Sequence, residues 1–319
     1  MTFGDRLRHT PAALRACTGL RPVEYAAFER DVLPRLAAAE QVRRQRPDRH
    51  RAVGAGHPGA LAARDQVLLT VVWLRLYPTH DVLALLFGLA AATTVGRTIA
   101  RVLPVLEAAG LATMRMPDPG RRQHRTLDAL LADTPALAVV FDTFEQRVQR
   151  PKDRAARDAW YSGKKKTHTI KTQVGVDEDT GHIVDVPESV PGPTADITLL
   201  ARSMVLTRLP PGVGGLGDLA YVSLDRLHPD GLGAAPRRKP RGRDRPPEDV
   251  AYNRAFARRR ITVEHSIGRL RHYQCLTHRD RQHRRMHTAR ARAVAGLVNR
   301  QIDHRLAACR LRRAAAPFP

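Results

Sequence analysis

The spacing of hydrophobic residues changes after residue 135, and this change divides the chain into two parts. Before it, apolar residues recur every three to four positions, which is the spacing of helices that bury one face. After it, short unbroken apolar runs at 137–141 and 213–217 alternate with helical stretches, as buried strands do. The pattern predicts a helical first part followed by a mixed α/β part.

The first part begins with residues 1–45, which are rich in Ala, Leu and Arg and are predicted to be helical with a break at 18–22. Residues 46–60 are rich in Gly, Pro and positive charge, so they are expected to form a loop or linker. Together they make an expected helical N-terminal region with a basic linker, residues 1–60. The pattern does not indicate a role for residues 1–45.

Three short helices are predicted next, over residues 65–77, 79–88 and 89–106, within an expected domain of residues 61–125. Pro78 ends the first, and Thr79 or Asp81 could cap the second. The layout is that of a helix-turn-helix, whose last helix enters the major groove of DNA. Three packed helices without a DNA role would give the same pattern. The third helix carries Thr93, Thr94, Arg97 and Arg101.

The α/β part is expected to contain a hairpin of residues 168–177 and 182–190, and a helix that starts near Asp196 and is capped by it. A last long helix over residues 253–271 carries an apolar stripe that would face the core. At about 100° per residue, Arg260, Glu264 and Arg271 share another face of that helix. By itself, an acid between two arginines indicates a surface ion pair.

Two buried strands are predicted to end in an acid, Asp142 and Asp218, and the last helix presents Glu264. Carboxylates beside buried strands are costly without a partner, and Mg²⁺ or Mn²⁺ prefers carboxylate oxygens. Three such groups could hold two ions, the arrangement used in phosphodiester chemistry. Strand-end aspartates that only cap turns are the alternative.

The charge of the chain supports a nucleic-acid partner. Its formal net charge is +23 and its pI is near 11.3, and residues 235–313 alone hold 23 Lys or Arg against 6 Asp or Glu. Three scattered cysteines fit a reducing cytoplasm, and no apolar stretch is long enough for a membrane span. One basic group could bind the DNA backbone near the acids or be a solvated charge run. This group consists of Lys164, Lys165, Lys166, His168 and Lys171.

A further set of residues, Cys275, His278, His283 and His287, offers only a loose match to a zinc site. A basic surface that carries histidines explains the same spacing.

Several motifs in order make the chain resemble bacterial transposases of the IS5 group, within the DDE transposase superfamily. The motifs lie at residues 141–151, 161–177, 192–196, 217–221 and 252–271. The sequence departs from the group's usual pattern at Thr143, where Gly is common, at Ala257, where Tyr is common, and at Arg271, where Lys is common. Arg271 keeps the charge but not the geometry of a lysine.

The resemblance implies an RNase H-like catalytic domain over residues 126–309, followed by a basic tail at 310–319. It implies a metal-binding triad of Asp142, Asp218 and Glu264, with Arg260 and Arg271 as further catalytic residues. Two Mg²⁺ or Mn²⁺ ions are expected. The predicted helix-turn-helix also resembles the one that the family carries, which makes Thr93, Thr94, Arg97 and Arg101 DNA-contact candidates.

The implied function is transposition: binding to the inverted repeats of an insertion sequence, phosphodiester hydrolysis and strand transfer, with a homodimer on DNA at the bacterial nucleoid in the cytoplasm. The alternatives are an inactive or repurposed DNA-binding protein, and an RNase H-like nuclease that does not transpose.

Overall fold

The computed structural model describes residues 2–45, 47, 59–120 and 129–314, which form two compact units. The first unit contains the described residues of 1–112, 272–278 and 292–319, and the second those of 113–271 and 279–291. These bounds differ from the expected domains in two ways. The described residues of 1–60 pack with 61–112 as one unit, and residues 272–278 and 292–309 of the expected domain 126–309 belong to that same unit. Most of the expected linker at 46–60 lies outside the described residues.

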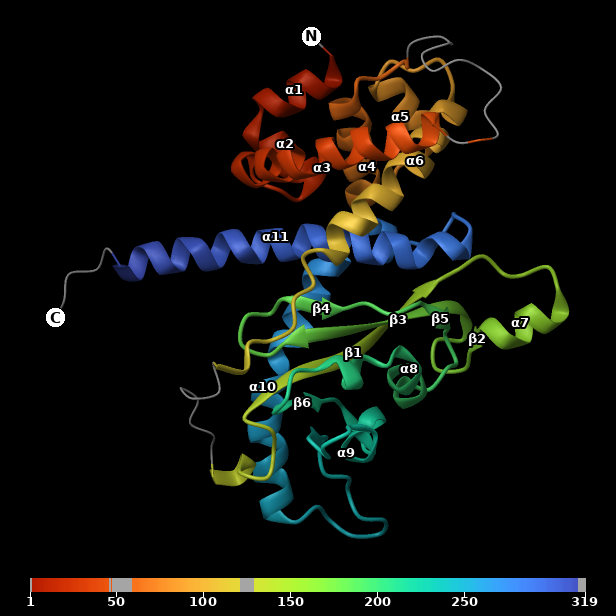
Figure 1. Ribbon diagram of the computed structural model, residues 1–319. Coiled ribbons are helices and arrows are strands. Elements are labelled where there is room, and N and C mark those ends of the chain that lie inside the picture. Colours follow the sequence, from red (N-terminus) through yellow and green to blue (C-terminus); the bar gives the residue numbers. More distant parts are fainter. Residues whose placement is uncertain (1, 46, 48–58, 121–128, 315–319) are drawn as a thin grey trace. The chain divides into compact units, whose positions relative to one another are not determined.

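The first unit is helical, as expected (Figure 1). Helix α4 is its centre, because every residue from Val67 to Leu74 is buried. Helices α2, α3 and α6 pack against it. The predicted break at 18–22 is present, with Gly19 in the left-handed region at φ 80°. The helices are α1 Phe3–His9, α2 Pro11–Thr18, α3 Pro22–Arg44, α4 Ala63–Leu76, α5 His80–Leu86 and α6 Ala92–Leu111.

The last part of this unit comes from the end of the chain. Helix α11, His287–Ala314, contributes its residues from Arg292 onward. A Cβ on Gly110 of α6 would lie 2.2 Å from the carbonyl oxygen of Arg292, and a Cβ on Gly296 would lie 2.4 Å from the Cα of Gly110. The two helix backbones therefore meet at glycines, where no side chain separates them.

The second unit is built on a seven-stranded mixed sheet. Its main path runs β2, β3, β1, β6, β7, and β4 and β5 also pair with β3. Strand β1 pairs antiparallel with β3 and parallel with β6, and β6 pairs parallel with β7. The strands are β1 Leu137–Arg147, β2 Tyr161–Ser162, β3 Thr167–Asp177, β4 Ile183–Asp185, β5 Val190–Pro191, β6 Val213–Leu216 and β7 Gly233–Ala234.

Helices flank this sheet, and the expected RNase H-like α/β fold is confirmed. Leu137, Val139 and Phe141 of β1 point to one face and pack in a core with residues of α8 and α9. Helix α10 packs against β1 and β3 (Figure 1). The helices are α7 Arg154–Trp160, α8 Asp196–Ser203, α9 Leu224–Leu227 and α10 Pro247–Arg271; short 3₁₀ turns include η2 Ala129–Leu131, η3 Val205–Arg208, η4 Leu219–Tyr221, η5 Gln274–Leu276 and η6 Arg284–Met286.

Three local predictions were wrong. Asp142 does not end its strand, because β1 stays paired with β3 as far as Arg147. The second arm of the hairpin is split into β4 and β5, with Pro187 between them, and proline cannot donate to a ladder. Asp196 does not cap α8, since the N-cap is Ala195 and no side chain caps it.

Candidate active site

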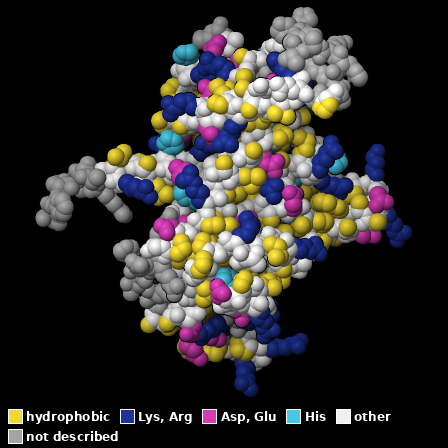
Figure 2. Space-filling model, in the orientation of Figure 1, with side chains coloured by type: hydrophobic (Ala, Val, Ile, Leu, Met, Phe, Trp, Pro, Cys, Tyr) yellow, Lys and Arg dark blue, Asp and Glu magenta, His cyan; other side chains and the backbone are white. Residues whose placement is uncertain are grey.

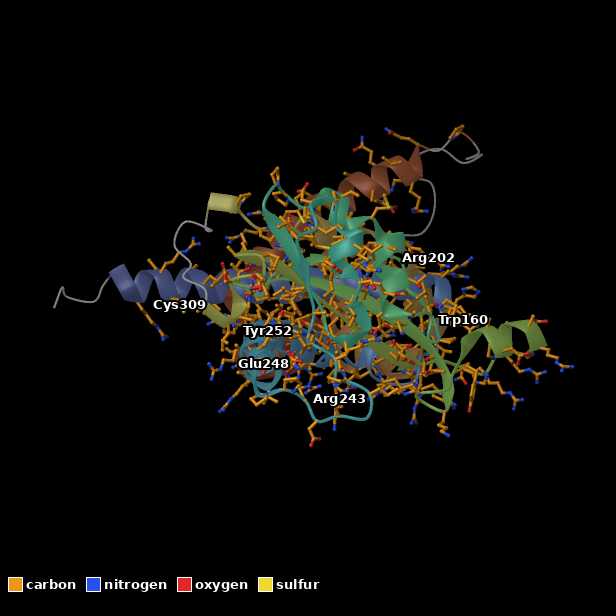
Figure 3. The ribbon with its side chains drawn as sticks, turned by 90° about the horizontal axis from the view of Figure 1, so that it is seen from below. Trp160, Arg202, Arg243, Glu248, Tyr252 and Cys309 are labelled. Carbon is orange, nitrogen blue, oxygen red and sulfur yellow. The ribbon has the colours of Figure 1, made fainter. Side chains whose placement is uncertain are left out.

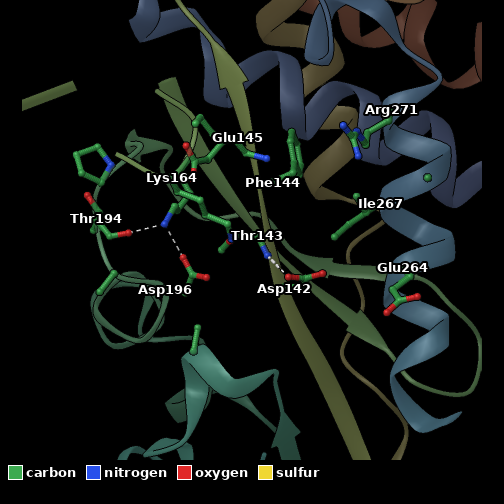
Figure 4. A pocket seen from close by; sticks show the side chains of 16 residues that line it. Asp142, Thr143, Phe144, Glu145, Lys164, Thr194, Asp196, Glu264, Ile267 and Arg271 are labelled. Atoms are coloured by element: carbon green, nitrogen blue, oxygen red, sulfur yellow. Dashed lines mark hydrogen bonds and ion pairs between the residues drawn. The ribbon is translucent and has the colours of Figure 1, made fainter. Parts of the chain in front are cut away.

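A cavity of about 640 Å³ opens in the second unit (Figure 4). Its walls come from the middle of β1, the turn before β3, the start of α8, η4 and the C-terminal turns of α10. The lining residues that carry charge are Asp142, Glu145, Lys164, Lys165, Lys171, Asp196, Glu264 and Arg271. Both signs of charge therefore face one enclosed volume.

Asp142 lies in the middle of β1 and is half-buried. The backbone N–H of Thr143 donates to its Oδ1 over 2.7 Å. Burial raises the pKa of Asp142 to about 6, and the Thr143 N–H and the charge of Arg260 only partly oppose this rise. The negative charges of Asp218 and Asp196 add to it. The groups that favour the charged form of this carboxylate therefore do not offset the effect of its burial.

Asp218 follows β6, as predicted, and begins the short turn η4. Its Oδ1 accepts a hydrogen bond of 2.8 Å from the backbone N–H of Ala220, which itself lines the cavity. The charge of Asp218 contributes to the raised pKa of Asp142, but Asp218 itself is not among the residues that line the cavity.

Glu264 is exposed on α10 and lines the cavity opposite Asp142 (Figure 4). Arg271, two turns further along the helix, lines it as well. Arg260 is half-buried, and its charge lowers the pKa of Asp142. The predicted shared face of Arg260, Glu264 and Arg271 therefore looks towards Asp142, while the predicted apolar stripe is buried.

The donor groups at the cavity suit a hard divalent cation, since carboxylate oxygens are its preferred ligands and Asp142 lacks compensating charge. Within the described residues, no three His, Cys, Asp or Glu side chains converge closely enough to hold a metal ion. His287, considered above for zinc, is fully buried in the second unit, where its Nε2 lies 2.7 Å from Oε1 of Gln146.

The basic group divides into exposed and engaged members. Lys164 and Lys165 are exposed and line the cavity, and Lys166 is exposed beside them. Lys171 is buried instead: its Nζ donates to Oδ1 of Asp196 and to the carbonyl of Thr194, each over 2.6 Å. Its charge is already paired, so a contact with DNA would require that pair to open.

His168 differs from the lysines, because its ring packs edge-on against Tyr161 with the ring centroids 5.6 Å apart. It is half-buried within the hairpin of β2 and β3.

Comparison with known proteins gives two family matches. Residues 141–299 match the model of the DDE superfamily endonucleases, and residues 59–111 match the helix-turn-helix of DDE superfamily endonucleases. The two matches together span more than half of the chain. It belongs to the DDE superfamily of transposases.

A similar protein is the probable transposase for insertion sequence element IS702 from Microchaete diplosiphon. The two sequences are 28% identical over 247 residues, which cover 77% of this chain and 83% of that protein. No solved structure matches the chain. DDE superfamily endonucleases use divalent metal ions, in keeping with the carboxylates at the cavity.

The helix-turn-helix of this DDE protein comprises α4, α5 and α6. Thr79 caps α5 as predicted, with its Oγ1 accepting from the N–H of Val82 over 3.4 Å. On α6, Thr93, Arg97 and Arg101 are exposed and Thr94 is half-buried. The side chains predicted to contact DNA thus lie mostly on the solvent face of α6.

Sequence reasoning missed the contacts that hold α10 on the sheet. Arg259 is buried and donates from Nε and Nη2 to the carboxylate of Glu178, over 2.5 and 2.7 Å. Ser266 donates to the carbonyl of Gly181 over 2.8 Å. A signal was present, because Arg259 stands three residues after Phe256 and four before Val263, inside the apolar stripe.

Proposed function

We propose that this protein is an active DNA transposase, which binds the inverted repeats of its insertion sequence, hydrolyses a phosphodiester bond to free a 3′-OH and joins that end to target DNA. The observation that carries the proposal is the single cavity at which Asp142 and Glu264 meet Lys164, Lys165 and Arg271. Carboxylates that could bind a metal ion and basic side chains that could bind phosphate line the same cavity. Phosphoryl transfer requires both kinds of group.

Asp142, Asp218 and Glu264 would hold Mg²⁺ or Mn²⁺, as two ions. When bound, the ions would supply Lewis-acid activation of the attacking oxygen and charge stabilisation of the leaving 3′ oxygen. The half-buried position of Asp142 supports this assignment, since a cation would offset the cost of desolvating its charge.

The cations around the cavity would hold the DNA. Lys164, Lys165 and Arg271 are exposed and would bind phosphate oxygens on either side of the scissile bond. Arg260 lies deeper and would stabilise negative charge near Asp142. The N–H of Thr143 keeps the Asp142 carboxylate in place, a contact that any residue except proline could supply at position 143.

Recognition of the repeats would fall to α6, with Thr93, Thr94, Arg97 and Arg101 in the major groove. Because two ends of an element must be brought together, we expect a homodimer when DNA is bound. Such a protein would act at the nucleoid of a bacterial cell.

The test is a cleavage and joining assay with DNA that carries the ends of the element. Asp142→Asn should lower Mg²⁺-dependent nicking on the order of a hundredfold or more while DNA binding persists. Asp225→Asn is the matched control, since Asp225 is an exposed acid on α9 outside the cavity lining. It should cleave as the wild type does.

The alternatives give different results in the same assay. Binding to the repeats without any metal-dependent cleavage by the wild type would indicate an inactive DNA-binding protein. Free 3′ ends that never join to a target plasmid would indicate a nuclease that does not transpose.

A further inference from the structure

The segment between β7 and α10 is the most basic exposed loop of the second unit that the structure describes. Residues 237–245 contain six Lys or Arg and one acid, Asp244. That acid is fully exposed and pairs with Lys239 at 3.4 Å, an ion pair in water that neutralises little. The loop therefore keeps a large local excess of positive charge, displayed at the surface as Figure 2 illustrates at the lower end of the molecule.

The base of this loop is tied to α10. The backbone N–H of Arg237 donates to Oδ1 of Asn253 over 2.8 Å, and Nδ2 of Asn253 donates back to the Arg237 carbonyl over 3.0 Å. The Arg237 guanidinium lies 4.3 Å from the centre of the Tyr252 ring and 3.0 Å from Oδ1 of Asp249. Four contacts thus hold Arg237, the first residue of the loop, against α10.

The tip of the loop is a turn centred on Gly242, which has φ 72°. Glycine adopts this left-handed conformation without strain, and a Cβ there would meet nothing within 4 Å. Arg241 and Arg243 flank the turn and are both exposed, and Figure 3 shows Arg243 on the outer part of the loop. The guanidinium groups of Arg241 and Arg243 are therefore exposed on either side of the turn at Gly242.

The near end of the loop contacts the backbone next to Asp218. Nη2 of Arg238 lies 3.5 Å from the carbonyl oxygen of Leu219, the residue that follows Asp218. The far end leads directly into α10, which carries Glu264. A polyanion held by this loop would therefore lie beside the strand end at which Asp218 stands.

We propose that the loop of residues 237–245 is a second DNA-binding site, which grips the phosphate backbone of duplex DNA without reading its sequence, through Arg241 and Arg243 at its tip. The proposal rests on the proposed function for the identity of the DNA. Guanidinium groups match the geometry of phosphate oxygens, and contacts to the phosphate backbone carry no sequence information. The site would hold DNA that flanks the scissile phosphate.

The test compares two full-length variants that lose the same charge. One is Arg241→Gln/Arg243→Gln in the loop, and the control is Arg202→Gln/Arg226→Gln, exposed arginines of α8 and α9 in the same unit. Figure 3 shows Arg202 away from the loop. The affinity for duplex DNA of arbitrary sequence is measured by fluorescence anisotropy at a series of KCl concentrations, and thermal unfolding checks that both variants fold.

The loop variant should lower the slope of log affinity against log salt by about 1.8, since each phosphate contact contributes about 0.9. Its affinity should fall roughly tenfold near physiological salt, equally for arbitrary DNA and for DNA with the element's ends. The control should keep the wild-type slope. An unchanged slope in the loop variant, or an equal loss in the control, overturns the proposal.

Two further results separate this site from the rest of the protein. Loss of affinity for duplex RNA but not for DNA in the loop variant would also overturn the proposal. A wild-type protein that binds DNA but does not cleave it would contradict the proposed transposase activity while leaving the loop assay intact.

Discussion

Each of the two units of the protein is stabilised internally by a different kind of contact. The first unit relies on apolar packing: α4 buries eight consecutive residues, Val67–Leu74, and α6 meets α11 at bare glycine backbone. In the first unit the buried Glu24 pairs with Arg21, whose side chain is 48% exposed, whereas the second unit contains ion pairs in which both partners are buried. The side chains of Arg259 and Glu178 are only 5% and 2% exposed, and those of Arg290 and Asp280 are 0% and 1% exposed.

This difference matches the structural task of each unit: the first forms a helical bundle, and the second positions α10 and its Glu264 on a sheet. Apolar contacts are non-directional, so they stabilise a bundle without fixing one side chain against another. A bidentate Arg–carboxylate pair is directional, and it sets the position of α10 along the sheet. Because α10 carries Glu264 between Arg259 and Ser266, the buried pair positions an acid of the candidate active site.

The largest effect is expected when that pair is broken. Arg259→Met should destabilise the second unit by about 3–5 kcal/mol, because the buried Glu178 would lose the guanidinium that compensates its charge. Arg259→Met/Glu178→Met should recover most of the loss, since two apolar side chains can replace a buried pair. Denaturant unfolding can be followed in each unit separately, because Trp160 lies in the second unit and Trp73 in the first. A double variant as unstable as the single one would contradict the explanation that the loss comes from an uncompensated buried charge.

The next effect tests packing in the first unit. Gly110→Ala should destabilise it by about 3 kcal/mol, because the added Cβ would meet the backbone oxygen of Arg292 at 2.2 Å and backbone cannot move aside as a side chain can. Gly88→Ala is a useful comparison, since its cost would come from φ 65° alone, with nothing within 4 Å. The Trp73 signal should report the loss in Gly110→Ala while the Trp160 signal stays at the wild-type midpoint.

The smallest effect is a pH dependence confined to the second unit. Burial lowers the pKa of His287 to about 3, helped by Arg290 and opposed by Asp280. In the unfolded chain the His287 imidazole binds a proton below about pH 6.5, whereas in the folded unit it stays neutral. The free energy of unfolding therefore falls as the pH drops from 6.5 towards 3. The loss should reach about 2 kcal/mol at pH 5.

His287→Gln removes the titration and can still bond to Gln146 and Ser189, which face the ring in the folded unit. The Trp160 transition of this variant should lose that part of its pH dependence between pH 6.5 and 5. If its midpoint varies with pH as in the wild type, the dependence comes from another group.

Much of the fold could be predicted from the sequence, because its signals are local. The helical spacing located α3 to α6, Thr79 was correctly placed as a cap, and the apolar runs at 137–141 and 213–217 located β1 and β6. The apolar stripe on α10 is buried as predicted, but Arg259 and Ser266 are buried beside it and were not predicted to be. The motifs further indicated the DDE superfamily, which the family matches bear out. The assignment of the individual catalytic and DNA-contacting residues remains a prediction.

Other features depended on partners distant in the chain, and only the tertiary structure decided them. Asp142 lies inside a strand because β3 pairs beyond it, and Lys171 is removed from the surface because Asp196 meets it across 25 positions. Three consecutive arginines stand at 258–260, but it is Arg259 that pairs with Glu178, 81 positions away in the sequence. The sequence by itself determined which elements form, through spacing and turn residues. Packing decided which charges are buried, which are paired and which stay exposed, because the cost of a charge depends on the groups that surround it.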